Sequence, residues 1–137
     1  MAQISARPTV ATVFGVLNII FGVFGVIGLF NIKNAFYFLG TLYGIISLLS
    51  GLVSILLLVA GIFLILDKGK ALAINRYYAY ASLAVTIIGA VFLIYMFGFT
   101  GMMGNIIAVI IGVIYPLLIL FVLLRNGDVR SYYSGRE

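Results

Sequence analysis

The residue types that usually carry catalysis or bind metals are scarce in this sequence. It contains no Cys and no His, which removes thiolate nucleophiles, imidazole bases and the usual ligands of zinc, haem and iron–sulfur clusters. The acids Asp67, Asp128 and Glu137 all lie outside the long apolar runs, which counts against proton-coupled transport. The serines within those runs have no base to activate them. The sequence predicts a protein that is not an enzyme, with no catalytic, cofactor-binding or metal-binding residues.

Two polar side chains lie deep inside apolar runs. Asn18 is the first, and we expect it to hydrogen-bond to a neighbouring helix; the alternative is contact with a ligand or an ion. The second is the hydroxyl of Tyr115, which needs a partner that Asn18 or Thr86 could supply. Pro116 removes a backbone hydrogen bond and frees the carbonyl of Gly112, which predicts a kink. The alternative is a hinge or gate at Tyr115 and Pro116.

The elements that position these residues are predicted from hydropathy. Hydrophobic residues make up 65% of the chain and charged residues 8%, against about 25% charged in soluble domains. A membrane-crossing helix needs about 20 apolar residues. The runs that meet this length cover 9–30, 40–66, 77–97 and 106–124. We therefore expect a single all-α transmembrane domain over 1–137, a polytopic four-transmembrane-helix bundle. Its last residues, 125–137, form a short basic tail.

The connections between these runs are expected to be short. Residues 31–34 and 98–105 read as tight turns, and Gly69 can adopt the left-handed conformation that ends a helix. The aromatic segment 35–39 either extends the second helix or lies in the membrane interface. A signal peptide is the alternative for the first run. Its 22 residues are too many, and no small-residue cleavage site follows it, so we expect a retained span.

Small residues recur at helical spacing along each run, and such stripes allow helices to pack closely in lipid. The predicted helix-packing residues are Gly15, Asn18, Gly22, Gly25, Gly40, Gly44, Ser47, Gly51, Ser54, Gly89 and Gly112.

The positive charges indicate orientation. In a four-span arrangement both termini lie on the same side of the membrane. Seven of the eight Lys and Arg residues fall on that side, and Lys33 alone falls on the opposite side. This bias predicts that both termini are cytoplasmic. The net charge of +5 is spread between apolar spans, so we expect no nucleic-acid partner. Contacts with lipid headgroups or a partner are expected from Lys68, Lys70, Arg76, Arg125 and Arg130, and Arg76 could also pair with Asp67 or Asp128.

Arg7 and Pro8 lead into a Gly-rich first run, and the Tyr-containing last run ends in the basic segment 124–130. In these features the chain resembles the small four-span membrane proteins common in bacterial genomes. The resemblance implies a four-helix membrane domain and no activity. In size and span number the chain also resembles the small multidrug exporters, which depend on a buried Glu in the first span. No Glu occurs there, which counts against membership.

Three functions remain open. The first is a structural or accessory subunit that packs against other membrane subunits or copies of itself, because Gly28, Ser50 and Ala90 lie off the small-residue stripes and could contact a neighbour. The second is a small channel or passive transporter, whose polar track would be Asn18, Ser47, Ser54 and Thr86. The third is a membrane-shaping or lipid-binding protein. In each case we expect a multi-pass protein of an inner or plasma membrane whose partners include membrane lipids.

Overall fold

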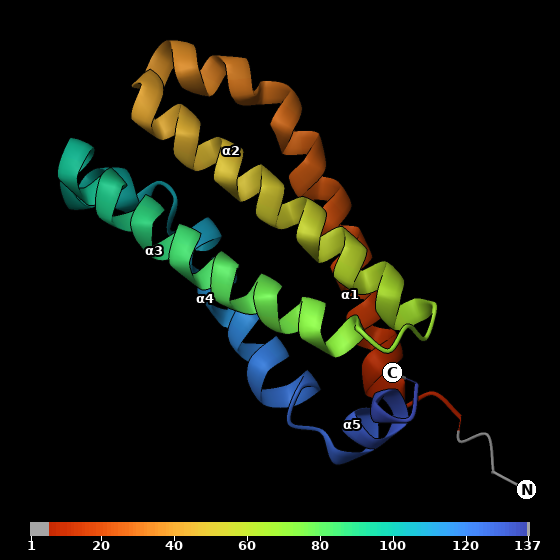
Figure 1. The fold of residues 1–137 in the computed structure, drawn as a ribbon. Coiled ribbons are helices and arrows are strands. Elements are labelled where there is room, and N and C mark those ends of the chain that lie inside the picture. The colour runs from red at the N-terminus through yellow and green to blue at the C-terminus, as the bar shows by residue number, and fades with distance from the viewer. Residues whose placement is uncertain (1–5, 137) are drawn as a thin grey trace, which may run out of the picture.

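The computed structural model describes residues 6–136 of the chain (Figure 1) and is helical throughout, with no strand in that range. Its elements are α1 (Thr9–Gly28), the 3-10 helix η1 (Leu29–Asn31), α2 (Ile32–Ile65), α3 (Ala71–Met103), α4 (Ile106–Leu118), the π-helix η2 (Ile119–Leu123) and α5 (Gly127–Ser134). Three helical stretches are long and apolar enough to cross a membrane: Thr9–Ile65, Ala71–Met103 and Ile106–Leu123. The predicted all-α fold class is confirmed.

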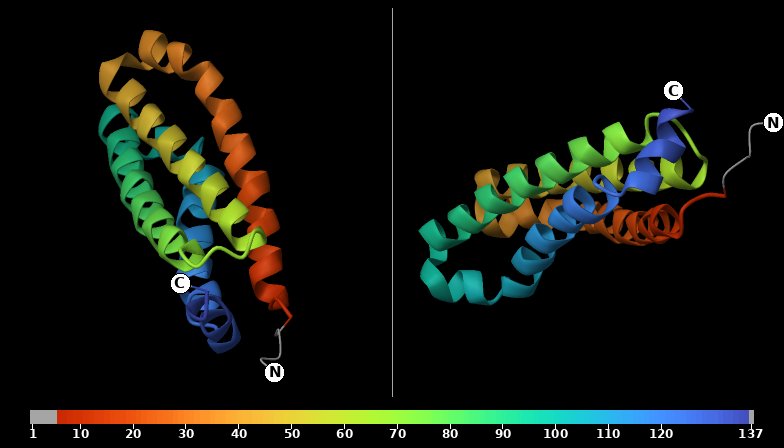
Figure 2. Two further views of the ribbon diagram at one scale, coloured as in Figure 1. Left: turned by 45° about the vertical axis from the view of Figure 1, so that its right-hand side comes forward. Right: turned by 90° about the horizontal axis from the view of Figure 1, so that it is seen from below.

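Helices α1 to α4 lie side by side, and each runs opposite to the one before it (Figures 1 and 2). α1 packs along α2, α2 along α3, and α3 along α4, whereas α1 approaches the fourth helix chiefly near η2. The short α5 lies at the same end of the bundle as residues 6–8. We call this the terminal end, and the opposite one the distal end.

The first reversal of the chain differs from the prediction. We expected a turn at 31–34, but η1 carries helical backbone through this segment, and the chain turns back at Gly40, whose φ is 88° and ψ 169°. Only glycine adopts such a conformation without a steric penalty. Residues 32–39 therefore form a short helix across the distal end (Figure 1).

The second distal reversal also differs. Residues 98–105 were expected to form a loop, yet helical structure continues to Met103, interrupted only at Gly98 with φ 65°. A turn at Gly104 and Asn105 then leads into α4. Each distal reversal therefore depends on one glycine with positive φ, and in both cases no atom would contact an added Cβ. Gly40, predicted to pack against a helix, has no atom of this chain within 4 Å of an added Cβ and serves the turn instead.

The contact between α1 and α2 is the closest in the bundle. A Cβ added at Gly22 would lie 2.7 Å from the backbone nitrogen of Leu58, and one added at Gly61 would lie 2.8 Å from the carbonyl oxygen of Gly15. At Gly25 and Gly51 the added atom would overlap the side chains of Ser54 and Leu29. Glycine is required along this seam because larger residues would push the two backbones apart.

The remaining predicted packing residues have looser or different neighbours. Gly112 lies against Thr86 of α3, and Gly44 lies under the ring of Phe36 from the short distal helix. A Cβ added at Gly89 would meet only a methyl group of Ile46, at 3.6 Å. The bundle is therefore close-packed between α1 and α2 and more open around Gly89.

Candidate functional site

Three buried polar side chains from three helices form one hydrogen-bonded cluster, which we call the polar lock. The hydroxyl of Tyr115 donates to Oδ1 of Asn18 at 2.5 Å, and Nδ2 of Asn18 donates to Oδ1 of Asn75 at 2.7 Å. Asn18 and Asn75 are 0% exposed, and Tyr115 is 8% exposed. The Asn18 amide thus acts as donor and acceptor at once, as expected for a polar group removed from water.

The lock includes one residue, Asn75, that the sequence analysis does not single out. Its Nδ2 donates to the carbonyl of Ala71 at 2.8 Å and, more weakly, to that of Ala60 at 3.4 Å. The sequence contains a pattern that could have pointed to Asn75. Residues 75, 79, 82, 86 and 89 are separated alternately by four and three positions, which places Asn75 in line with the small residues of α3. Asn18 lies in the middle of the corresponding α1 stripe, which consists of residues 11, 15, 18, 22 and 25.

Pro116 makes the helix irregular from α4 into η2. The carbonyl of Gly112, which Pro116 deprives of its helical donor, accepts a hydrogen bond from Oγ1 of Thr86 at 3.3 Å. Beyond Pro116 the helix widens into η2, where the nitrogen of Leu124 donates to the carbonyl of Ile119. The helix is irregular here, and a neighbouring side chain satisfies the freed backbone group. The ring of Tyr115 is also held edge-on by Phe21, with centroids 4.9 Å apart.

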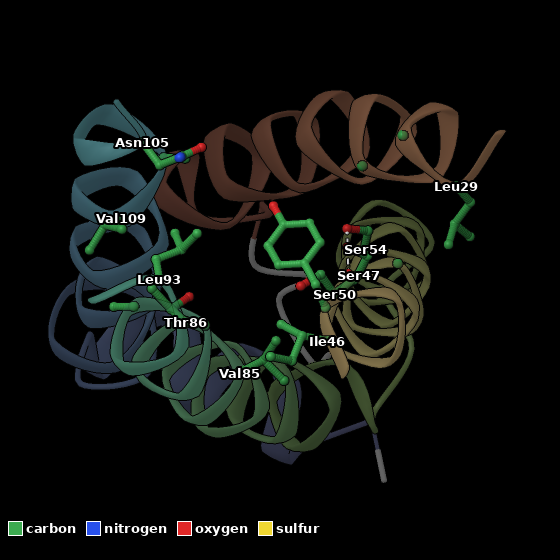
Figure 3. A pocket seen from close by; sticks show the side chains of 17 residues that line it. Leu29, Ile46, Ser47, Ser50, Ser54, Val85, Thr86, Leu93, Asn105 and Val109 are labelled. Carbon is green, nitrogen blue, oxygen red and sulfur yellow. Dashed lines mark hydrogen bonds between the residues drawn. The ribbon is translucent and has the colours of Figure 1, made fainter. Parts of the chain in front are cut away.

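A cavity of about 370 Å³, which we call the central cavity, lies on the distal side of the lock and is lined by residues from all four long helices (Figure 3). Its polar lining consists of Tyr43, Ser47, Ser50, Ser54, Thr86 and Asn105, and its small lining residues include Gly25, Gly28, Gly51, Gly89, Ala90 and Ala108. Gly28, Ser50 and Ala90, which by sequence could contact a neighbouring subunit, border this cavity, and Gly28 and Ser50 are exposed. Asn18 does not border it.

The part of the chain that the structure describes gives the cavity free hydroxyl groups and no charge. The hydroxyl of Ser54 donates to the carbonyl of Ser50 at 2.9 Å, and that of Thr86 is held by Gly112. Within residues 6–136, Ser47 and Ser50 form no side-chain hydrogen bond, and no Asp, Glu, Lys or Arg lines the space. Because Ser50 and Asn105 are exposed, the cavity is open to the outside rather than sealed. It can accept an uncharged molecule and hydrogen-bond to it.

The terminal end is held by an ion pair that we did not predict. The guanidinium of Arg7 donates to both carboxylate oxygens of Asp67, at 2.8 and 2.9 Å, and also to the carbonyl of Ile65. Asp67, rather than Gly69, has the left-handed conformation that ends the helix, with φ 55°. Asp67 is therefore not a partner of Arg76. The hydrogen bond from Arg7 lowers the pKa of Asp67 and raises that of Arg7.

The C-terminal tail folds back onto this ion pair. Tyr133 of α5 is buried, and its hydroxyl donates to the carbonyl of Leu64 at 2.7 Å. Burial raises the pKa of this hydroxyl to about 12. The predicted basic contacts divide into two groups: Lys68 and Lys70 are exposed in the turn before α3, whereas Arg76, Arg125 and Arg130 border one pocket.

The polar lock predicts the effect of removing a single hydroxyl. We expect Tyr115→Phe to destabilise the bundle by about 0.5–2 kcal/mol, because an interhelical hydrogen bond in a membrane contributes about 0.6 kcal/mol and one lone pair of Asn18 loses its donor. Reversible unfolding in bicelles measures the change. Tyr95→Phe is the matched control, since Tyr95 is 84% exposed. Equal stability of the two variants would contradict a structural role for the lock.

The Arg7–Asp67 pair predicts a pH dependence. Because the pKa of Asp67 is lowered on folding, its contribution is complete above the ordinary value near 3.8 and is lost as pH falls through the folded value. We expect Asp67→Asn, which tolerates positive φ, to cost about 1 kcal/mol or less at neutral pH. The cost should vanish in strong acid. Thermal unfolding in detergent across this range measures it, and a pH-independent difference would count against the ion pair.

Known proteins do not assign a role to these features. Comparison with family models, with curated proteins and with solved structures finds no match to this chain. The chain combines a buried polar lock, a terminal end held by an ion pair, and an uncharged cavity on the distal side.

Proposed function

We propose that this chain is a non-enzymatic integral membrane protein that crosses the bilayer four times and holds an uncharged, lipid-like amphiphile in its central cavity. The observation that carries the proposal is the cavity itself. It is bordered by free hydroxyl groups and small apolar residues, and it lies in an otherwise apolar bundle.

The length of the first helical stretch supports four crossings. Thr9–Ile65 contains 57 residues, which would measure about 85 Å as one straight helix, against a hydrocarbon core of about 30 Å. The reversal at Gly40 divides it into two legs that run in opposite directions. With α3 and α4 this gives four passes, whose connections alternate between the terminal and distal ends.

Charge supports the orientation. Arg7, Asp67 and α5 lie together at the terminal end, and seven of the eight Lys and Arg residues belong to that side by sequence. Positive residues in short loops remain on the cytoplasmic side. We therefore place both termini in the cytoplasm of a cell whose inner or plasma membrane contains the protein. The cavity then opens towards the outer half of the bilayer.

Size and lining define the class of ligand. Small-molecule sites measure about 300–1,000 Å³ and combine apolar walls with a few polar groups. The 370 Å³ cavity is at the small end of this range. Its uncharged lining disfavours a buried charged group, whereas Ser47 and Ser50 can hydrogen-bond to a hydroxyl or carbonyl oxygen. An apolar amphiphile taken up from the bilayer satisfies both conditions.

The polar lock favours binding over conduction. A solute that entered the cavity would have to separate three buried, mutually bonded side chains to reach the terminal end. The accessory-subunit hypothesis stays a prediction. The small residues that suggested it border the cavity, and the tail that could have docked on a partner is bound to Leu64 of its own chain.

Cysteine labelling tests the orientation directly, because the chain contains no Cys. We expect a membrane-impermeant thiol reagent to modify Met102→Cys from outside intact cells and Gly135→Cys only after the membrane is opened. The two substitutions lie in exposed or half-buried positions at opposite ends. Labelling of residue 102 only from the cytoplasm would overturn the orientation.

Filling the cavity tests the ligand. A Cβ added at position 89 would make one ordinary contact, with Ile46, and Gly89 borders the cavity, so we expect Gly89→Phe to fold and to occupy the site. Purification in mild detergent followed by native mass spectrometry should find one amphiphile per wild-type chain and none in this variant. The matched control is Ile88→Phe, at a position that is 54% exposed on the same helix. Wild-type protein without bound amphiphile, or with a stoichiometric second protein instead, would overturn the proposal.

A further inference from the structure

A second pocket, at the terminal end, is bordered by three arginines from different parts of the chain. It measures about 360 Å³ and lies between Arg76 of α3, Arg125 after η2 and Arg130 of α5. Its remaining wall includes Leu120, Phe121 and Leu124. Folding thus gathers positive charge from positions 76, 125 and 130 around one apolar surface.

The charge of this pocket is not balanced by nearby acids within residues 6–136. The carboxylate of Asp67 is bound by Arg7, and Asp128 borders a separate pocket beside Thr9 and Tyr132. The side chains of Arg76 and Arg130 form no hydrogen bond or ion pair with other described residues. The guanidinium of Arg125 lies 5.1 Å above the ring of Phe121, a cation–π contact that holds it beside the apolar wall.

This combination specifies the ligand. Guanidinium groups bind phosphate oxygens in a planar, bidentate geometry, and a pocket with three of them calls for an anion. Apart from the arginines and Tyr80, the lining of the pocket is apolar, and the side chain of Phe121 is 55% exposed. A free anion would gain nothing from that surface, whereas the acyl chains of a lipid would cover it.

We propose that this pocket binds the phosphate group of an anionic phospholipid from the leaflet at the terminal end, with the acyl chains against Leu120, Phe121 and Leu124. The proposal rests on the membrane-spanning arrangement argued above, but not on the central cavity.

The test is lipid binding to the full-length protein in dodecyl maltoside micelles, followed by native mass spectrometry during titration with phosphatidylglycerol or phosphatidylcholine. We expect one phosphatidylglycerol per chain at this site, bound more tightly than phosphatidylcholine. Each arginine near an anionic headgroup contributes about fivefold in affinity, so Arg76→Gln combined with Arg130→Gln should weaken phosphatidylglycerol binding roughly 25-fold.

Matched variants separate this site from general electrostatics. Lys68→Gln combined with Lys70→Gln removes the same charge at the same end but outside the pocket, and should leave the affinity unchanged. Gly89→Phe should also leave the affinity for phosphatidylglycerol unchanged, which distinguishes this pocket from the central cavity. Circular dichroism and thermal unfolding verify that the arginine variant is folded.

Three results would overturn the proposal. Equal loss of affinity in the lysine variant would mean that the whole terminal end attracts lipid. Displacement of the lipid by millimolar inorganic phosphate would mean that the site takes the free anion. Equal affinity for phosphatidylcholine would mean that the arginines do not recognise the headgroup charge.

Discussion

The fold depends on how one buried amide is satisfied. Asn18 lies on the α1 face that contacts α2, so closely that Gly61 of α2 has no room for a Cβ beside it. In that position it has no access to water, and it must find both a donor and an acceptor on other helices. Tyr115 and Asn75 provide them. The lock therefore fixes α1, α3 and α4 relative to one another at one level of the bundle.

This level separates two different regions. Towards the terminal end, Leu64, Val129 and Tyr133 are almost completely buried, and Arg7 clamps the end of α2. Towards the distal end, α1 and α4 diverge, the lining residues are small, and space remains between the helices. Because the buried polar lock lies between the central cavity and the terminal end, we propose that the bundle holds a molecule rather than passing it through.

Features that depend on local pattern were predictable from the sequence. Hydropathy predicted an all-helical chain, and glycine spacing pointed to the residues of the α1–α2 seam. Two candidate hydrogen-bond partners for Tyr115, Asn18 and Thr86, could be named because the apolar runs contain few polar side chains. Features set by tertiary distance were not predictable. A small residue permits either a close helix contact or an empty space. The sequence around Gly28, Ser50 and Ala90 is therefore compatible with a contact to a neighbour and with a cavity. Arg7 and Asp67 meet only because the bundle brings residues 60 positions apart together.

The most direct test of the account is a double-mutant cycle between Asn75→Ala and Tyr115→Phe, measured by reversible unfolding in bicelles. These two residues reach each other only through Asn18. If the lock acts as one unit, the two losses of stability should be non-additive by about 0.5 kcal/mol or more. Additive losses, within about 0.3 kcal/mol, would show that the residues act independently and would contradict the central role given to Asn18.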